Sequence, residues 1–196
     1  MQPDTDEKMA VKIGFAETVT GIITSPAATM REISSGNALY MALPAFILAM
    51  LVSNAATVLT EAELVQLLGG PAPALAALTA FSFLFLVSQS GLCYFLARLF
   101  GCRGRFAALL SLLALANVPS IFTAPLALTM LVPDPAATIL HGLGSFTLVV
   151  WIIALSVLAV RETFQVSAGR AVIIYFLPLF LFLALVAALV LAVLLP

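Results

Sequence analysis

The sequence predicts an all-α, polytopic membrane protein built as a bundle of five transmembrane helices. Of its 196 residues, 63% are hydrophobic and only 9% are charged, and the mean hydropathy is +1.21. Soluble domains are usually about 45–50% apolar and about 25% charged. This composition excludes a soluble enzyme and a disordered chain. The net charge of −1 also leaves no basic surface to bind a nucleic-acid backbone.

Five apolar stretches are long enough to cross the membrane as helices. A transmembrane helix needs about 20 mostly apolar residues, and the continuous apolar runs lack the alternation that a β-barrel strand requires. The expected spans are Leu39–Thr60, Ala76–Phe100, Ala107–Leu131, Ala137–Val160 and Ala171–Leu195. The chain therefore divides into a cytoplasmic interfacial segment, residues 1–38, and a five-helix transmembrane domain, residues 39–196.

The residues before the first span predict two short helices on the cytoplasmic interface. Ser25-Pro26 is typical of an N-cap followed by proline at the first helical position, and Gly36 is expected to end the second helix. Both pieces are too short or too polar to span the membrane, so we expect them to lie on its surface or to pack under the bundle. The first piece carries one apolar stripe at helical spacing, formed by Val11, Phe15, Val19 and Ile22.

The positions of Lys and Arg predict the orientation of the bundle. All eight positive charges lie before the first span, around the loop after the second, or between the fourth and fifth. The other two loops carry only acidic residues, Glu61, Glu63 and Asp134. Cytoplasmic loops of membrane proteins carry the excess of Lys and Arg. The N-terminus is therefore predicted inside and the C-terminus outside.

The basic inner loops are the best-marked candidate site. Arg103 and Arg105 flank a glycine in the loop after the second span, and Arg161 and Arg170 bound the loop between the fourth and fifth spans. Neighbouring basic loops at a membrane surface attract anionic lipid head groups, so these arginines are candidate contacts for lipids or for a protein partner. The alternative is that they only determine the topology.

Neutral polar residues inside the spans form a second candidate. No Asp, Glu, Lys or Arg lies near the midplane of an expected span, so the usual parts of a proton relay or an ion-coupled carrier are missing. The most polar residues that remain are Asn54 in the first span, Gln89 in the second and Asn117 in the third. They are expected either to hydrogen-bond between helices or to line a polar path.

Glycines and prolines inside the spans predict close packing and kinks. Small residues let helix backbones approach each other in membranes, and proline removes a backbone donor and kinks a helix. The glycines concerned are Gly91, Gly142 and Gly144, and the prolines are Pro119 and Pro125 in the third span and Pro178 in the fifth.

No pattern of residues indicates catalysis or a metal site. His141 has no Cys, Asp or Glu at the spacing of a metal site, and Cys93 and Cys102 form neither a zinc pattern nor a disulfide framework. A nucleophile elbow, a Walker loop and an HExxH pattern are all missing from the sequence. We therefore expect no enzyme activity, no cofactor and no metal.

Several short motifs, taken in order along the chain, resemble one membrane family. They are Ser25-Pro26 and Ile33 before the first span, Gly101 and Gly104-Arg105-Phe106 after the second, Asn117-Val118-Pro119 in the third, Trp151 in the fourth and Ser167-Ala168-Gly169-Arg170-Ala171 at the start of the fifth. Over roughly residues 21–195 this order resembles the Yip (Ypt-interacting protein) family of five-span domains, in its compact bacterial form.

The resemblance implies a multi-pass protein of the bacterial inner (cytoplasmic) membrane that associates with lipids, with itself or with other membrane proteins. Eukaryotic relatives act in vesicle traffic between the endoplasmic reticulum and the Golgi and bind Rab-type GTPases. Their long N-terminal cytoplasmic region and an Asp-Leu-Tyr-Gly-Pro stretch are missing here, which leaves GTPase binding doubtful.

Two functions follow as hypotheses. The first is a non-enzymatic membrane protein of Yip type that organises lipids or membrane-protein partners through its bundle and inner loops. The second is a small permease or channel subunit with a neutral polar path through the second and third spans, formed by Gln89 and Asn117. A water-accessible cavity that reaches both residues would favour transport, whereas a close-packed interior would favour the organising role.

Overall fold

A computed structural model describes residues 15–35, 39–131 and 134–194 of the chain. In these ranges the regular structure is entirely helical, as the sequence predicts. The elements are α1 (Phe15–Thr24), α2 (Pro26–Ser35), α3 (Leu39–Thr60), α4 (Ala62–Leu67), α5 (Pro71–Leu99), α6 (Phe106–Ala116), the 3₁₀ helix η1 (Val118–Phe122), α7 (Thr123–Thr129), α8 (Pro135–Phe164) and α9 (Ala168–Leu194).

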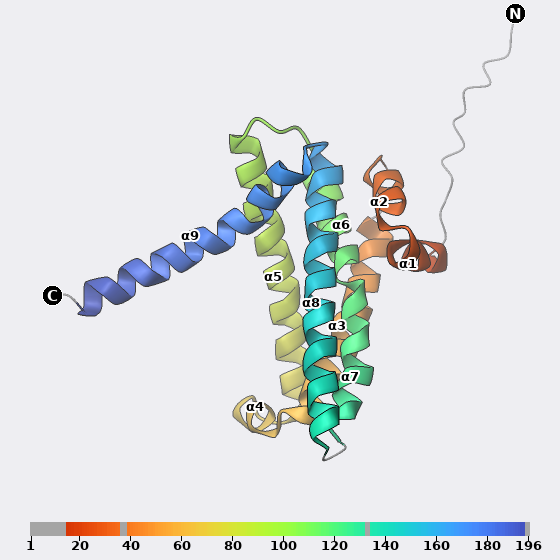
Figure 1. Ribbon diagram of the computed structural model, residues 1–196, viewed down its shortest axis with the longest axis vertical. Coiled ribbons are helices and arrows are strands. Elements are labelled where there is room, and N and C mark those ends of the chain that lie inside the picture. Colours follow the sequence, from red (N-terminus) through yellow and green to blue (C-terminus); the bar gives the residue numbers. More distant parts are fainter. Residues whose placement is uncertain (1–14, 36–38, 132–133, 195–196) are drawn as a thin grey trace, which may run out of the picture.

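Among the described residues, four helical stretches are long and apolar enough to cross a membrane. They are α3, α5, the run of Phe106–Thr129 that comprises α6, η1 and α7, and α8. Figure 1 shows these four packed side by side as one bundle. The predicted all-α membrane bundle is therefore confirmed, and each of the first four expected spans corresponds to one of these helices.

The fifth expected span corresponds to α9, which leaves the bundle. Its first two turns bury Ala171 and Ile174, whereas Phe180 and Leu181, beyond Pro178, are exposed. In Figure 1 the remainder of α9 points sideways, away from the other helices. That α9 crosses the membrane stays a prediction.

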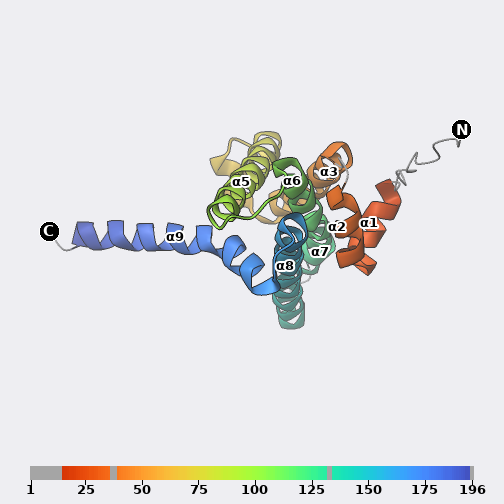
Figure 2. The ribbon, with the colours of Figure 1, turned by 90° about the horizontal axis from the view of Figure 1, so that it is seen from above.

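The core of the bundle is built around α6. Viewed from above, α6 lies among α3, α5 and α8 (Figure 2). Leu109, Leu112 and Leu115 of α6 are almost completely buried. In the span Phe106–Thr129, 67% of an apolar stretch of 18 residues is buried inside the protein. Because lipid tails are as apolar as leucine, close packing and interhelical hydrogen bonds rather than exclusion from water hold such helices together.

The third span is broken where its prolines predict a kink. The helix α6 ends at Ala116, and the chain continues through η1 before α7 begins. Pro119 cannot donate a backbone hydrogen bond, and the backbone N–H of Asn117 donates to Ala114 O (3.2 Å), as in a 3₁₀ turn. The break therefore lies at the proline, and the two halves remain one path across the bundle.

The expected close approach of helices at glycine holds for one of three positions. A Cβ at Gly144 of α8 would overlap the end of the Leu126 side chain in α7, so the glycine allows the two helices to approach closely there. Gly91 and Gly142 face open space instead, and the prediction of close packing at these two residues is wrong.

The short N-terminal helices pack against the bundle. Ile22, Met30 and Ile33 are buried, and α2 contacts both α6 and α8. Ile22 is the last residue of the predicted apolar stripe, and its side chain is buried inside the protein. Val11 lies outside the described residues, and the side chains of Phe15 and Val19 are likewise not described. The cytoplasmic position of residues 1–38 and their division from residues 39–196 stay predictions.

Candidate functional site: the arginine-rich end of the bundle

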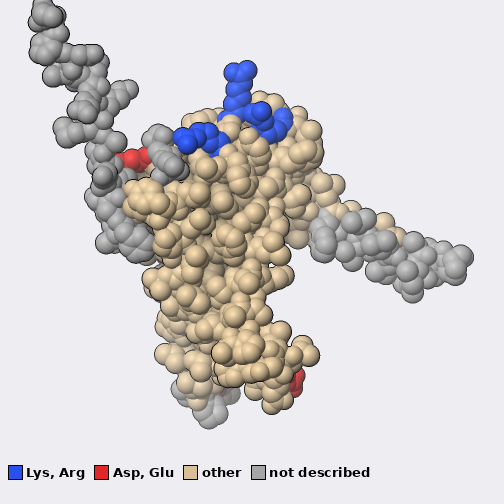
Figure 3. Space-filling view, turned by 180° about the vertical axis from the view of Figure 1, so that it is seen from behind, with Lys and Arg blue, Asp and Glu red and all other residues tan. Residues whose placement is uncertain are grey.

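All of the arginines lie at one end of the bundle. Figure 3 shows the basic side chains gathered at the end where, in Figure 1, α5 and α8 finish and α6 and α9 begin. Glu61 and Glu63 lie at the other end, next to and within α4, and Asp134 precedes α8 there. The arginines of the described residues are Arg31, Arg98, Arg103, Arg105, Arg161 and Arg170.

The structure brings the two predicted basic loops together. A Cβ at Gly104 would lie 2.6 Å from Phe164 Cδ1 at the end of α8, so the turn between α5 and α6 rests directly on α8. The ring of Tyr94 contacts Phe164 and Phe106, with centroids 6.2 and 5.7 Å away. These contacts hold the exposed side chains of Arg103 and Arg105 next to the end of α8.

Arg161 lies in a helix rather than in the loop that the sequence predicted. The helix α8 continues to Phe164, past the expected end at Val160, and stops where Gln165 takes the left-handed conformation with φ of 52°. The Arg161 Nε atom lies 3.8 Å from Glu162 Oε1, and 45% of the arginine side chain is exposed. Arg170 belongs to the first turn of α9 and is exposed.

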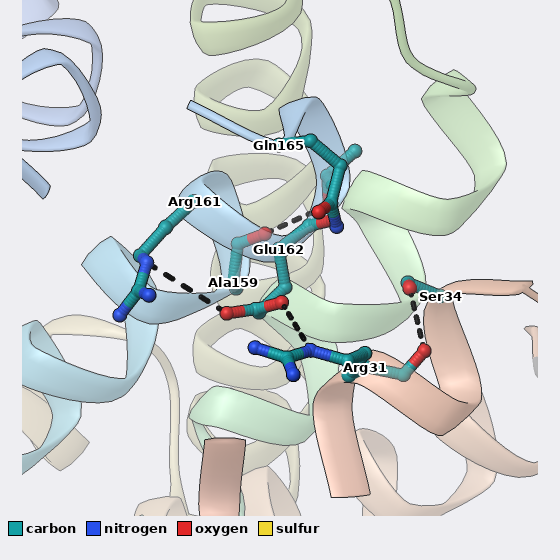
Figure 4. A network of polar contacts seen from close by, with 7 residues as sticks. Arg31, Ser34, Ala159, Arg161, Glu162 and Gln165 are labelled. Atoms are coloured by element: carbon teal, nitrogen blue, oxygen red, sulfur yellow. Dashed lines mark hydrogen bonds and ion pairs between the residues drawn. The ribbon is translucent and has the colours of Figure 1, made fainter. Parts of the chain in front are cut away.

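A buried carboxylate at this end was missed by the sequence analysis. The Glu162 side chain is only 3% exposed and accepts a hydrogen bond from Arg31 Nε at 3.3 Å, as Figure 4 shows. The Gln165 amide donates to the Glu162 carbonyl at 2.7 Å. A signal was available, because Leu155, Ala159 and Glu162 recur at helical spacing and all three are buried.

The Arg31–Glu162 ion pair attaches α2 to the end of α8. The two residues are 131 positions apart, and the Arg31 side chain remains 67% exposed. A carboxylate out of water is stable only when it is paired and hydrogen-bonded. The pair therefore adds a polar contact to the apolar contacts of Met30 and Ile33.

Asn54 makes an interhelical hydrogen bond in the bundle. Its amide nitrogen donates to Thr79 Oγ1 (3.2 Å) and Ser82 Oγ (3.5 Å) of α5. Nearby, Thr123 donates to Ser53 Oγ at 2.9 Å. Such bonds between transmembrane helices are worth roughly 0.5–2 kcal/mol each. Asn54 thus serves to join α3 to α5.

Asn117 repairs the break in the third span. Its side-chain amide donates to the Leu113 carbonyl at 2.8 Å. In a regular helix that carbonyl would accept from the backbone N–H of residue 117, which here donates to Ala114 instead. An unsatisfied carbonyl in the membrane interior costs several kcal/mol, so the asparagine has a clear structural role.

Gln89 and Asn117 border one small cavity but do not bond to each other. The cavity of about 140 Å³ lies between α3, α5 and the end of α6, and Ser82 also lines it. On its other side Gln89 borders a hollow of about 270 Å³ between α5 and α9, beside Tyr175 and Pro178. Among the described residues, the Gln89 amide makes no hydrogen bond.

No cluster of metal-ligating side chains occurs among the residues that the structure describes. His141 instead places Nδ1 3.0 Å from the Leu126 carbonyl, and Cys93 is a buried free thiol. Both residues therefore contribute to packing between helices.

A comparison with known protein families shows to which family the chain belongs. The family described as the Yip1 domain matches residues 20–189, from α1 to most of α9. The chain belongs to the Yip1 domain family. The motif-based resemblance to the Yip family is thereby confirmed, and this Yip1 domain is a multi-pass membrane protein. No curated protein and no solved structure matches the chain.

The first prediction concerns the ion pair that attaches α2 to this Yip1 domain. Replacing Arg31 with Gln leaves the buried Glu162 carboxylate with Arg161 as the only cation that the described residues place near it, at the longer distance of 3.8 Å. We expect the free energy of unfolding in detergent to fall by about 1–3 kcal/mol. Hydrogen exchange should become faster across α1 and α2.

Two further variants control this experiment. Arg161→Gln should have a smaller effect, because its contact to Glu162 is longer than that of Arg31. Adding Glu162→Gln to Arg31→Gln should recover part of the stability, since no unpaired charge remains buried. Wild-type stability and exchange in the Arg31→Gln protein would show that the pair does not hold α2.

The second prediction separates the roles of Gln89 and Asn117. Asn117→Leu leaves the Leu113 carbonyl without its donor and should lower the free energy of unfolding by about 1–3 kcal/mol. Gln89→Leu removes no hydrogen bond among the described residues and should be nearly neutral. Thermal unfolding in detergent should find the two effects additive in the double variant. A large loss in Gln89→Leu that Asn117→Leu partly restores would show that the two side chains are partners.

Proposed function

We propose that this Yip1-domain protein is a non-enzymatic protein of the bacterial inner membrane that organises anionic lipids, and through them membrane-protein partners, at its arginine-rich end. The observation that carries the proposal is the packing of Gly104 against Phe164. This contact places the loop that carries Arg103 and Arg105 against the last turn of α8, three residues after Arg161.

The chemistry of this end fits an anionic membrane surface. Arg103, Arg105 and Arg170 are exposed, and no ion pair engages them within the described ranges. A cytoplasmic leaflet with anionic lipids attracts each juxtamembrane Lys or Arg by about 1 kcal/mol. We infer that this end faces the cytoplasm, in agreement with the excess of Lys and Arg found on that side of membrane proteins.

A permease or channel subunit is the second candidate function. The cavity that Gln89 and Asn117 share supports it, because both residues line the same space between α3, α5 and the end of α6. Against it stands the close packing of α6, where Leu109, Leu112 and Leu115 are almost fully buried. Asn54 and Asn117 also have structural hydrogen bonds. The organising role is the better supported of the two.

The third prediction tests the organising role through lipid-dependent stability. Phosphatidylglycerol added to the detergent-purified protein should raise its Tm more than phosphatidylcholine does. Arg103→Gln/Arg105→Gln should reduce this difference, because two arginines near an anionic surface account for about 2 kcal/mol of attraction. Salt should weaken the difference, since it screens exposed charges.

Matched variants complete this test. Arg103→Lys/Arg105→Lys keeps the charge and should keep most of the difference between the lipids. Glu61→Gln/Glu63→Gln alters charge at the opposite end of the bundle and should leave the difference unchanged. Equal stabilisation by both lipids in the wild-type protein would contradict a role in organising anionic lipids.

A further inference from the structure

Two neighbouring hollows lie on the first part of α9, and we call them together the α9 groove. The first hollow, about 240 Å³, is lined by Phe100, Arg170, Ile173 and Ile174. The second, about 320 Å³, is lined by Val172, Ile173, Phe176, Leu177 and Phe180. Ile173 lines both hollows, so they adjoin at this residue, and their lining residues extend along α9 from Arg170 to Phe180.

The groove is apolar along its length and carries a cation at one end. Arg170 is the only charged residue that lines it, and no ion pair within the described ranges engages this arginine. From Arg170 to Phe180 the helix rises about 15 Å, which is about half of a hydrocarbon core of roughly 30 Å. The length and polarity of the groove match those of a phospholipid in one leaflet, which has a charged head group and a long apolar tail.

We propose that the end of α5 and the first three turns of α9 form a binding site for one anionic phospholipid. Arg170 binds the lipid phosphate, and one acyl chain lies in the groove past Ile173 towards Phe180. This inference rests on the proposed function and narrows it from an arginine-rich end to a single site. The phosphate contact is a charge-assisted hydrogen bond to guanidinium.

Charge favours a lipid over a second copy of the chain. A symmetric contact between two copies places the same surface on both sides. Arg170 and the neighbouring arginines of one copy would then approach those of the other, and juxtaposed like charges oppose association. A lipid phosphate supplies the opposite charge, and its acyl chain supplies the apolar surface that Ile173, 55% exposed, and Phe180, 62% exposed, leave uncovered.

The test is native mass spectrometry of the purified, detergent-released protein titrated with phosphatidylglycerol or phosphatidylcholine. The wild-type protein should retain one phosphatidylglycerol more tightly than any phosphatidylcholine. Arg170→Gln should weaken phosphatidylglycerol about fivefold, since it removes one arginine–phosphate contact. Phosphatidylcholine should be weakened less, because its choline cation already neutralises the phosphate charge. Ile173→Trp, which fills the groove where the hollows meet, should weaken the retained phosphatidylglycerol at least threefold.

Two variants serve as matched controls. Leu181→Trp adds the same bulk to α9 at a side chain that is 56% exposed and lines neither hollow. Arg98→Gln removes the same charge at the same end of the bundle, where Arg98 lies over the Tyr94 ring and outside the groove. Leu181→Trp should bind phosphatidylglycerol like the wild-type protein, and Arg98→Gln should lose less affinity for phosphatidylglycerol than Arg170→Gln does.

The outcomes separate this site from the broader function. If phosphatidylglycerol preference falls in Arg103→Gln/Arg105→Gln but stays intact in Arg170→Gln and Ile173→Trp, the α9 site is overturned and the organising role stands. If the wild-type protein shows no preference, both are overturned. Loss in Arg170→Gln without loss in Ile173→Trp, or displacement of the lipid by millimolar inorganic phosphate, would indicate a simple anion contact and would also overturn the α9 site.

Discussion

A bundle of apolar helices keeps its charges at its ends, and in this chain one end holds all of the described arginines (Figure 3). The other end carries Glu61, Glu63 and Asp134. Charged groups inside a membrane are costly, so the interior of the bundle is left to neutral side chains, and the asymmetry of charge predicts the orientation. The proposed lipid contacts depend on the same separation of charge.

Packing around α6 gives the arginine-rich end its shape. Gly104 lets the turn after α5 rest on Phe164, and the buried Glu162 holds Arg31 of α2 at the same end. Further along the third span, Asn117 satisfies the Leu113 carbonyl that the proline break would otherwise expose. Polar side chains in this protein thus repair or join helices, which is the expected use of neutral and paired groups in a membrane.

The sequence predicted most of the helices and the position of the arginines, because apolar length and charge placement are local properties. It predicted the kink at Pro119 for the same reason. It did not reveal the Arg31–Glu162 pair, whose partners are far apart in the chain, and it ended the fourth span too early at Val160 because charged residues follow. The sequence also could not show which glycines lie at a helix contact. Gly144 differs from Gly142 only in having Leu126 packed against it, and that contact is visible only in the structure.

The side of the membrane that the arginines face is tested most directly by cysteine accessibility. In a Cys93→Ala/Cys102→Ala background, single substitutions Glu63→Cys, Asp134→Cys and Arg105→Cys would be exposed to an impermeant thiol reagent in intact spheroplasts. We expect the cysteines at 63 and 134 to be labelled from outside and the cysteine at 105 to be labelled only after the membrane is opened. Labelling of the cysteine at 105 alone in intact spheroplasts would contradict the orientation and, with it, contact between these arginines and the cytoplasmic leaflet.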